Sequence, residues 1–96
     1  MNKYEAMFIV RTDLNEADKK TLQGQITEAI TKNEGKIVTT LVWAERKKLT
    51  FDIKKFKEAD YFLVNFEILA EKINAIKEVY RLNESILRLI ILKNEK

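Results

Sequence analysis

Apolar and polar residues alternate at the start of this chain, and further along the apolar residues recur with a different period. In the stretch from Tyr4 to Arg11 one face carries Tyr4, Ala6, Phe8 and Val10, and the other carries Met7 and Ile9. Alternation with apolar side chains on both faces is typical of a strand in the centre of a sheet. We therefore expect the chain to begin with a central strand.

The period becomes helical over residues 16–33, where the apolar residues are Leu22, Ile26, Ala29 and Ile30. Asn15 is well suited to cap this helix, because its side chain can accept a hydrogen bond from an amide of the first turn. Gly35 is expected at the C′ position, where a left-handed residue ends many helices. Gly24 lies inside the helix and costs up to about 1 kcal/mol relative to alanine.

The second half of the chain predicts two strands, a helix and a last strand. From Lys36 to Lys54 the residues are rich in β-branched and aromatic types, which favours one long strand, bent near Ala44 to Arg46. The elements expected after it are a charged turn at Lys55 to Glu58, a strand from Tyr61 to Ile68, a helix at about 70–82 and a strand from Ile86 to Lys93.

The resulting order, β-α-β-β-α-β, predicts a ferredoxin-like α+β fold with a four-stranded antiparallel sheet and two helices on one face. We expect one domain over residues 1–96. The predicted core is Ala6, Phe8, Val10, Leu22, Ile26, Ile30, Phe62, Val64, Phe66, Ile73, Ile76, Leu89 and Ile91. The opposite face of the sheet would expose Met7, Ile9, Leu63 and Ile90. So much apolar surface without a covering helix indicates a partner.

The composition excludes several kinds of catalytic and metal-binding site. The chain has no cysteine and no histidine, which excludes disulfides, thiolate or imidazole metal sites and the commonest general base. Its carboxylates are scattered, and no glycine-rich phosphate loop is present. We therefore expect no enzyme activity, no cofactor, no metal and no small-molecule substrate. The lack of a leader or long apolar run predicts a cytoplasmic protein that makes no contact with a membrane.

Positive charge is concentrated in one segment. The residues from Arg46 to Lys57 include six cations and one anion, a local net charge of +5, whereas the whole chain carries +3. Apolar residues interrupt the run, so the cations would lie on a strand and its turn, where they could neutralise nucleic-acid phosphates. The alternative is a solvated edge strand whose lysines prevent unwanted strand pairing.

Two further features leave alternatives open. Arg88 lies between apolar neighbours in the last strand and could meet a phosphate, a partner or an acid within the sheet. Trp43, Phe51 and Tyr61 could stack on bases. The motif of RNA-recognition domains is absent, however, and packing in a core or against a partner explains these aromatics as well.

Three segments, in order, resemble the bacterial small-subunit ribosomal protein six family. They are the opening from Lys3 to Arg11, the stretch from Trp43 to Lys54 and the closing strand from Asn83 to Ile91. The Glu34-Gly35 step after the first helix also matches. The family's signature reads tryptophan-glycine, two basic residues, any residue, leucine-alanine-tyrosine, any residue, isoleucine. This chain departs from it in having Glu45 where glycine is expected, Trp43 one place early, and Thr50 and Phe51 for alanine and tyrosine.

The resemblance implies a structural constituent of the small ribosomal subunit, located in the ribosome. It implies binding to the central domain of small-subunit ribosomal RNA, together with ribosomal protein eighteen, during assembly of the platform. Taken with the basic stretch, it makes the expected RNA-binding residues Arg46, Lys47, Lys48, Lys54, Lys55, Arg88, Lys3 and Arg11. The expected partner-binding residues are Trp43, Phe51, Met7, Ile9, Leu63 and Ile90. The alternative function is a ferredoxin-like interaction module that self-associates without binding RNA.

Overall fold

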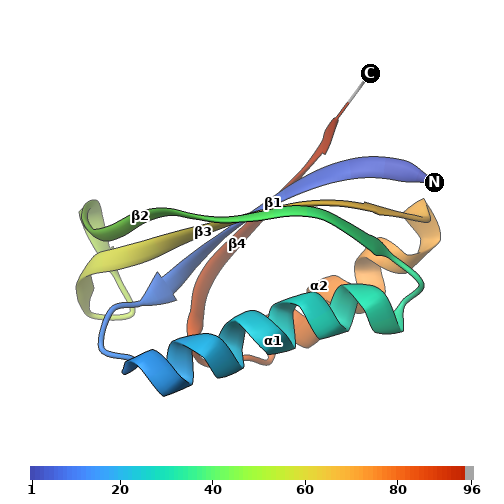
Figure 1. Cartoon of the computed structure of the whole chain (residues 1–96). Coiled ribbons are helices and arrows are strands. Elements are labelled where there is room, and N and C mark those ends of the chain that lie inside the picture. Colours follow the sequence, from blue (N-terminus) through green and yellow to red (C-terminus); the bar gives the residue numbers. More distant parts are fainter. Residues whose placement is uncertain (95–96) are drawn as a thin grey trace.

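The structure is a computed structural model that describes residues 1–94, apart from the side chains at 42–44 and 51. Its elements are β1 (Asn2–Arg11), α1 (Glu16–Lys32), β2 (Lys36–Ile53), β3 (Phe56–Ile68), the 3₁₀ turn η1 (Ala70–Lys72), α2 (Ile73–Arg81) and β4 (Ile86–Asn94). The strands form one antiparallel sheet in the order β2-β3-β1-β4, and both α-helices lie on one side of it (Figure 1). The predicted α+β class, the antiparallel sheet with two helices and the central first strand are confirmed.

The main core fills the space between the helices and the facing side of the sheet. Every residue predicted for the core is buried there or packs against it. Tyr80 is an addition to that set, with only 2% of its surface exposed. Its ring meets Phe8 edge-on with centroids 4.8 Å apart, and its hydroxyl donates to the carbonyl of Ile26 at 2.6 Å. Burial raises the pKa of Tyr80. This one side chain therefore ties α2 to both β1 and α1.

The cap of α1 confirms Asn15, and the end of the helix corrects the role of Gly35. The side chain of Asn15 accepts from the amide of Asp18 at 2.8 Å. At the other end the left-handed residue is Glu34, with φ of 65°, and not the glycine. The amides of Glu34 and Gly35 donate to the carbonyls of Thr31 and Ile30, which makes a Schellman motif with Gly35 one place later than predicted.

Gly35 is needed for space. A β-carbon at this position would lie 2.6 Å from Cγ2 of Ile30 and 2.8 Å from its carbonyl oxygen. The sequence pattern identified the glycine correctly but gave the wrong reason, because the chain takes up the left-handed turn at a non-glycine residue.

The hairpin between β2 and β3 is longer and tighter than predicted. The turn consists of Lys54 and Lys55, with Ile53 paired to Phe56, so the residues after Lys55 belong to β3 and not to a charged turn. Both lysines have positive φ, 48° and 72°. A two-residue turn of this kind favours asparagine and glycine, which explains why the sequence did not reveal it.

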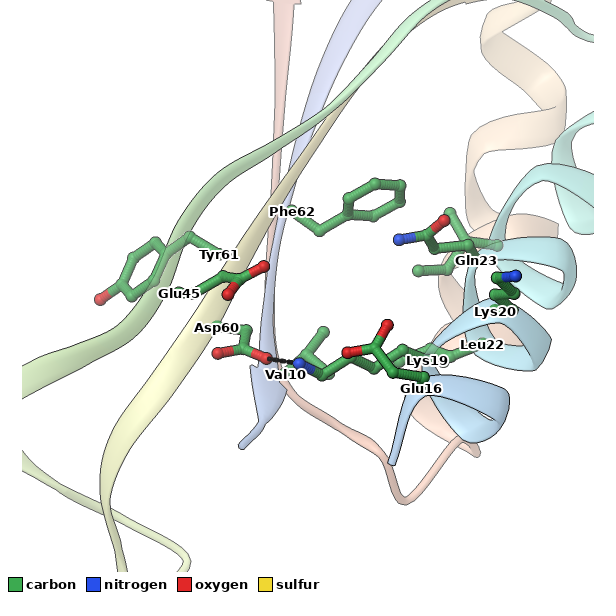
Figure 2. Close-up of a pocket in the computed structure, with 11 residues that line it drawn as sticks. Val10, Glu16, Lys19, Lys20, Leu22, Gln23, Glu45, Asp60, Tyr61 and Phe62 are labelled. Carbon is green, nitrogen blue, oxygen red and sulfur yellow. Dashed lines mark ion pairs between the residues drawn. The ribbon is translucent and has the colours of Figure 1, made fainter. Parts of the chain in front are cut away.

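The bend in β2 is confirmed, and its cause is an extra residue. Ala44 pairs with Tyr61 and Lys47 with Ala59, so β2 has one residue more than β3 in this interval. Arg46 takes φ of 49° there, and its amide donates to Oδ1 of Asp60 at 2.8 Å. The other oxygen of this buried carboxylate lies 3.5 Å from Nζ of Lys19 on α1 (Figure 2). Asp60 therefore connects the bend to the helix.

The two glycines predict opposite responses to the same substitution. Gly24→Ala should raise the free energy of unfolding by up to about 1 kcal/mol, because no atom of the described residues lies within 4 Å of the new β-carbon and alanine favours the helix. Gly35→Ala should lower it by about 1–3 kcal/mol through overpacking against Ile30. Urea denaturation of both variants checks this pair, and a neutral Gly35→Ala would show that the close approach is not constraining.

Asp60 predicts a graded loss of stability. Asp60→Ala leaves the part-buried amide of Arg46 without its acceptor and should lower the free energy of unfolding by about 1–3 kcal/mol. Asp60→Asn keeps an oxygen for that amide and loses only the charge facing Lys19, so its cost should be clearly smaller. Equal losses in the two variants, measured by thermal and urea unfolding, would contradict the role given to the hydrogen bond.

Candidate nucleic-acid interface

The cations of the basic segment project from one hairpin. Arg46, Lys47, Lys48, Lys54, Lys55 and Lys57 are all exposed, on the distal half of the β2–β3 hairpin and its turn. We call this set the basic hairpin. It carries five of the eight residues expected to bind RNA, so the structure brings most of them together.

The basic hairpin is held in place by a second, small apolar cluster. Its buried members are Ile9, Ala59 and Leu87, and Leu49, Ile53, Phe56 and Tyr61 pack against them. Leu49, Ile53 and Phe56, which interrupt the charged run, thus point inward onto β1 and β4, while the cations are exposed to solvent. A cationic surface fixed in this way can meet phosphates without first losing the conformational entropy of a loose tail.

Two cations near the hairpin, one of them within the basic hairpin, lie over aromatic rings. Nζ of Lys47 lies 5.3 Å from the ring centroid of Tyr61, and the guanidinium of Arg11 lies 5.4 Å from that of Phe56. Both distances suit cation–π contacts. Arg11 is also bound by Asp13, with Nε–Oδ1 and Nη2–Oδ2 distances of 3.0 and 2.7 Å. Their hydrogen bond lowers the pKa of Asp13 and raises that of Arg11. This pair offsets the positive charge of Arg11 and uses two of the five N–H donors of its guanidinium.

Lys3 and Arg88 lie in different places. Lys3 pairs with Glu67 at the other end of β1, eight residues from Arg11, which is roughly 27 Å along a strand. It is not part of the basic hairpin, whose tip lies at the opposite end of the sheet from the N-terminus (Figure 1). Arg88 pairs with Ile9 and lines the same hollow as Lys54, so it does lie near the hairpin turn.

The sheet face without helices carries a continuous apolar row. Residues paired across antiparallel strands lie side by side on one face. The pairings Leu41–Leu63, Leu63–Met7 and Met7–Ile90 therefore run across all four strands, and we call these four residues the open-face row. Leu41 and Ile90 are 55% and 37% exposed. Met7, Leu63 and Ile90 were predicted as partner contacts. Leu41 was not, because the bulge at Val38 reverses which face of the sheet the later residues of β2 occupy.

Not all predicted partner contacts are available in this row. Ile9 lies on the same face but is buried beneath the basic hairpin, with 6% of its surface exposed. It therefore offers a partner almost no surface, because the hairpin packs on it. Trp43 and Phe51 lie in β2, and their side chains are outside the part of the chain that the structure describes.

A cavity of about 210 Å³ lies between α1 and the sheet, beside the bend in β2 (Figure 2). Leu22, Ile26 and Phe62 give it apolar walls, while Lys19, Lys20, Glu16 and Glu45 also line it. Its charged groups are of both signs, so it has no clear preference for an anion. Tyr61 points away from it, toward the other face of the sheet (Figure 2). No local pattern in the sequence predicts this cavity, because its lining residues come from β1, α1, β2 and β3.

Within residues 1–94 the structure has no group of three or more acidic side chains placed to hold a metal ion. Over the same range, none of the helices is both long and apolar enough to span a membrane.

Solved structures of known proteins share this fold. The chain matches 30S ribosomal protein S6 from Thermotoga maritima with a TM-score of 0.89 and 26% identity, over 97% of this chain and 87% of that one. It matches the C-terminal domain of the MgtC protein from Mycobacterium tuberculosis with a TM-score of 0.62 and 10% identity, over 99% and 89% of the two chains. It also matches a chain from the complex of the Thermotoga maritima chemotaxis kinase CheA P2 domain with CheY. The TM-score is 0.54 and the sequence identity 14%, over 97% of this chain and 98% of that one. The last two likenesses show the fold alone.

The sequence profile of the ribosomal protein S6 family matches residues 3–93. The proteins of this family are structural ribosomal proteins, and it is not an enzyme family. The profile match and the likeness to a 30S subunit protein agree with each other over nearly all of the chain. The chain is a ribosomal protein of the small subunit and belongs to the ribosomal protein S6 family.

Proposed function

We propose that this chain binds the central domain of small-subunit ribosomal RNA together with ribosomal protein eighteen, as a structural constituent that acts during assembly of the platform. The basic hairpin is the observation that carries the RNA part of this proposal. Its six cations are exposed on a segment that the second apolar cluster fixes to the sheet. Family membership supports a location in the ribosome.

We assign the protein partner to the open-face row. An apolar row across four strands, with Leu41 and Ile90 exposed at its two ends, resembles half of a protein interface. The row and the basic hairpin adjoin, because Tyr61 and Ile9 form the next pair along the same two strands as Leu63 and Met7. A partner on the row could therefore extend the cationic surface, which a net charge of +3 leaves small.

We assign the 96 residues to one domain of the ferredoxin-like type. The strand order β2-β3-β1-β4 with both helices on one face supports that assignment. Self-association through the edge strand β2 is the less favoured function. The ladder between β2 and β3 is irregular at four places, and bulges on an edge oppose strand addition.

Charge reversal on the basic hairpin should weaken RNA binding without unfolding the domain. Lys47→Glu with Lys48→Glu places two anions where we expect phosphates. The Kd for a central-domain ribosomal RNA fragment, measured by filter binding with ribosomal protein eighteen present, should rise by about tenfold or more at 0.1 M salt. For the unsubstituted chain, the logarithm of affinity should fall steeply with the logarithm of salt concentration.

The matched control is Lys20→Glu with Lys32→Glu, which reverses two exposed charges on α1. It should bind nearly as well as the unsubstituted chain. Equal losses in both double variants would show that only net charge matters, and unchanged binding in the hairpin variant would remove the hairpin from the interface.

An acidic residue on the open-face row should weaken the contact with ribosomal protein eighteen. Leu41→Glu and Ile90→Glu each bury a charge in the proposed interface, so the Kd should rise by about tenfold or more in isothermal titration. Val79→Glu, at a 49%-exposed apolar position on α2, should leave it unchanged. If all three variants bind alike, the partner docks elsewhere.

A further inference from the structure

A hollow between α2 and the edge strand β4 gathers cations from three elements. Its volume is about 200 Å³, and the cations that line it are Lys54 from the hairpin turn, Lys77 and Arg81 from α2, and Arg88 from β4. We call these four residues the α2–β4 cluster. All four are exposed, and no carboxylate is among the described residues that line the hollow. Its apolar walls include Tyr80 and Leu87.

The fold fixes where these charges lie. Lys77 and Arg81 are four residues apart on α2 and so share one side of the helix. Tyr80, between them, is anchored in the main core by its hydrogen bond to Ile26. Lys54 follows Ile53, which packs with Leu87 in the second apolar cluster. The cluster is therefore placed by buried neighbours of its members, and not by attraction among the members themselves.

Like charges around one hollow repel one another, although water and salt screen exposed groups, and a bound anion would remove that repulsion. Among the described residues, the ion pair recorded for the cluster joins Arg81 to Glu78. Nε of Arg81 donates to Oε2 of Glu78 at 3.3 Å, and Nη2 donates to Oε1. This pairing lowers the pKa of Glu78 and raises that of Arg81.

The pair with Glu78 leaves Arg81 able to bind a ligand. A guanidinium has five N–H donors, and these two bonds use only two of them. Counting Glu78, the cluster still carries +3, which equals the net charge of the whole chain. A concave site of one sign attracts anions more strongly than the same charges scattered over a convex surface.

We propose that the α2–β4 cluster binds phosphates of an RNA backbone and forms a second RNA contact beside Arg46, Lys47 and Lys48. The inference rests on the proposed RNA-binding function and adds Lys77 and Arg81 to its contacts. Continuity favours RNA over a small free anion, because Lys54 belongs both to the basic hairpin and to this cluster. One backbone can thus pass from the hairpin into the hollow, where successive phosphates meet successive cations.

The test is Lys77→Gln with Arg81→Gln, two exposed changes that keep good helix formers on α2. The probe is the same central-domain ribosomal RNA fragment, with ribosomal protein eighteen present, over a series of salt concentrations. The Kd should rise several-fold at 0.1 M salt, and the log–log salt slope should become shallower by roughly 1.5, at about 0.7–0.9 per lost phosphate contact. The control is Lys20→Gln with Lys32→Gln on α1, which also removes one cation paired to a glutamate and one other.

Each outcome is decisive. If the control and the α2 variant bind alike while the unsubstituted chain binds tightly, the inference is wrong and the proposed function stands. If the unsubstituted chain does not bind RNA, both fail. A parallel NMR titration with inorganic phosphate at constant ionic strength tests whether the hollow binds a free anion and not RNA. Shifts of α2 and β4 amides with phosphate, but no effect of the α2 variant on RNA binding, would assign the hollow to a free anion and overturn the RNA contact.

Discussion

The hydrogen bond between the amide of Arg46 and the buried carboxylate of Asp60 fixes the bend in β2, and the arrangement of the surface depends on that bend. An extra residue in β2 requires a strained backbone at Arg46, which the carboxylate compensates. Beyond the bend, the hairpin can reach across β1 and pack its apolar residues near Ile9 and Leu87. Lys19 extends the same linkage to α1, so the helix layer and the hairpin are coupled through one side chain.

The two apolar clusters of the sheet have different roles. The larger one, on the helix side, gives the domain its stability, and the smaller one, under the hairpin, fixes the position of the cations. Because the second cluster covers Ile9, the apolar surface left on the open face is reduced to a row with exposed ends at Leu41 and Ile90. Cationic and apolar surfaces thus lie next to each other on one molecule, an arrangement suited to joining an RNA and a protein in one assembly.

Most of the strained backbone lies in the basic hairpin. Among the described residues four non-glycine residues have positive φ, and three of them, Arg46, Lys54 and Lys55, belong to the basic hairpin. Each such residue costs of order 1–3 kcal/mol, so a sequence chosen for stability alone would have glycine or asparagine there. Placing cations at these positions retains charge at the tip and at the bend. The fourth residue, Glu34, accompanies the close contact between Gly35 and Ile30.

The sequence by itself determined the order of the elements, the helix cap at Asn15 and every member of the predicted core, because periodicity and capping are local properties of the chain. It also located the basic segment and the family. Only the tertiary structure decided that Glu34 and not Gly35 takes the left-handed turn, that Ile9 is covered, and that Leu41 completes the apolar row. Lys77 and Arg81 gave no signal either, since their neighbours in the hollow are Lys54 and Arg88, far away along the chain. Bulges, strand register and packing between distant segments set these features, and no local pattern encodes them.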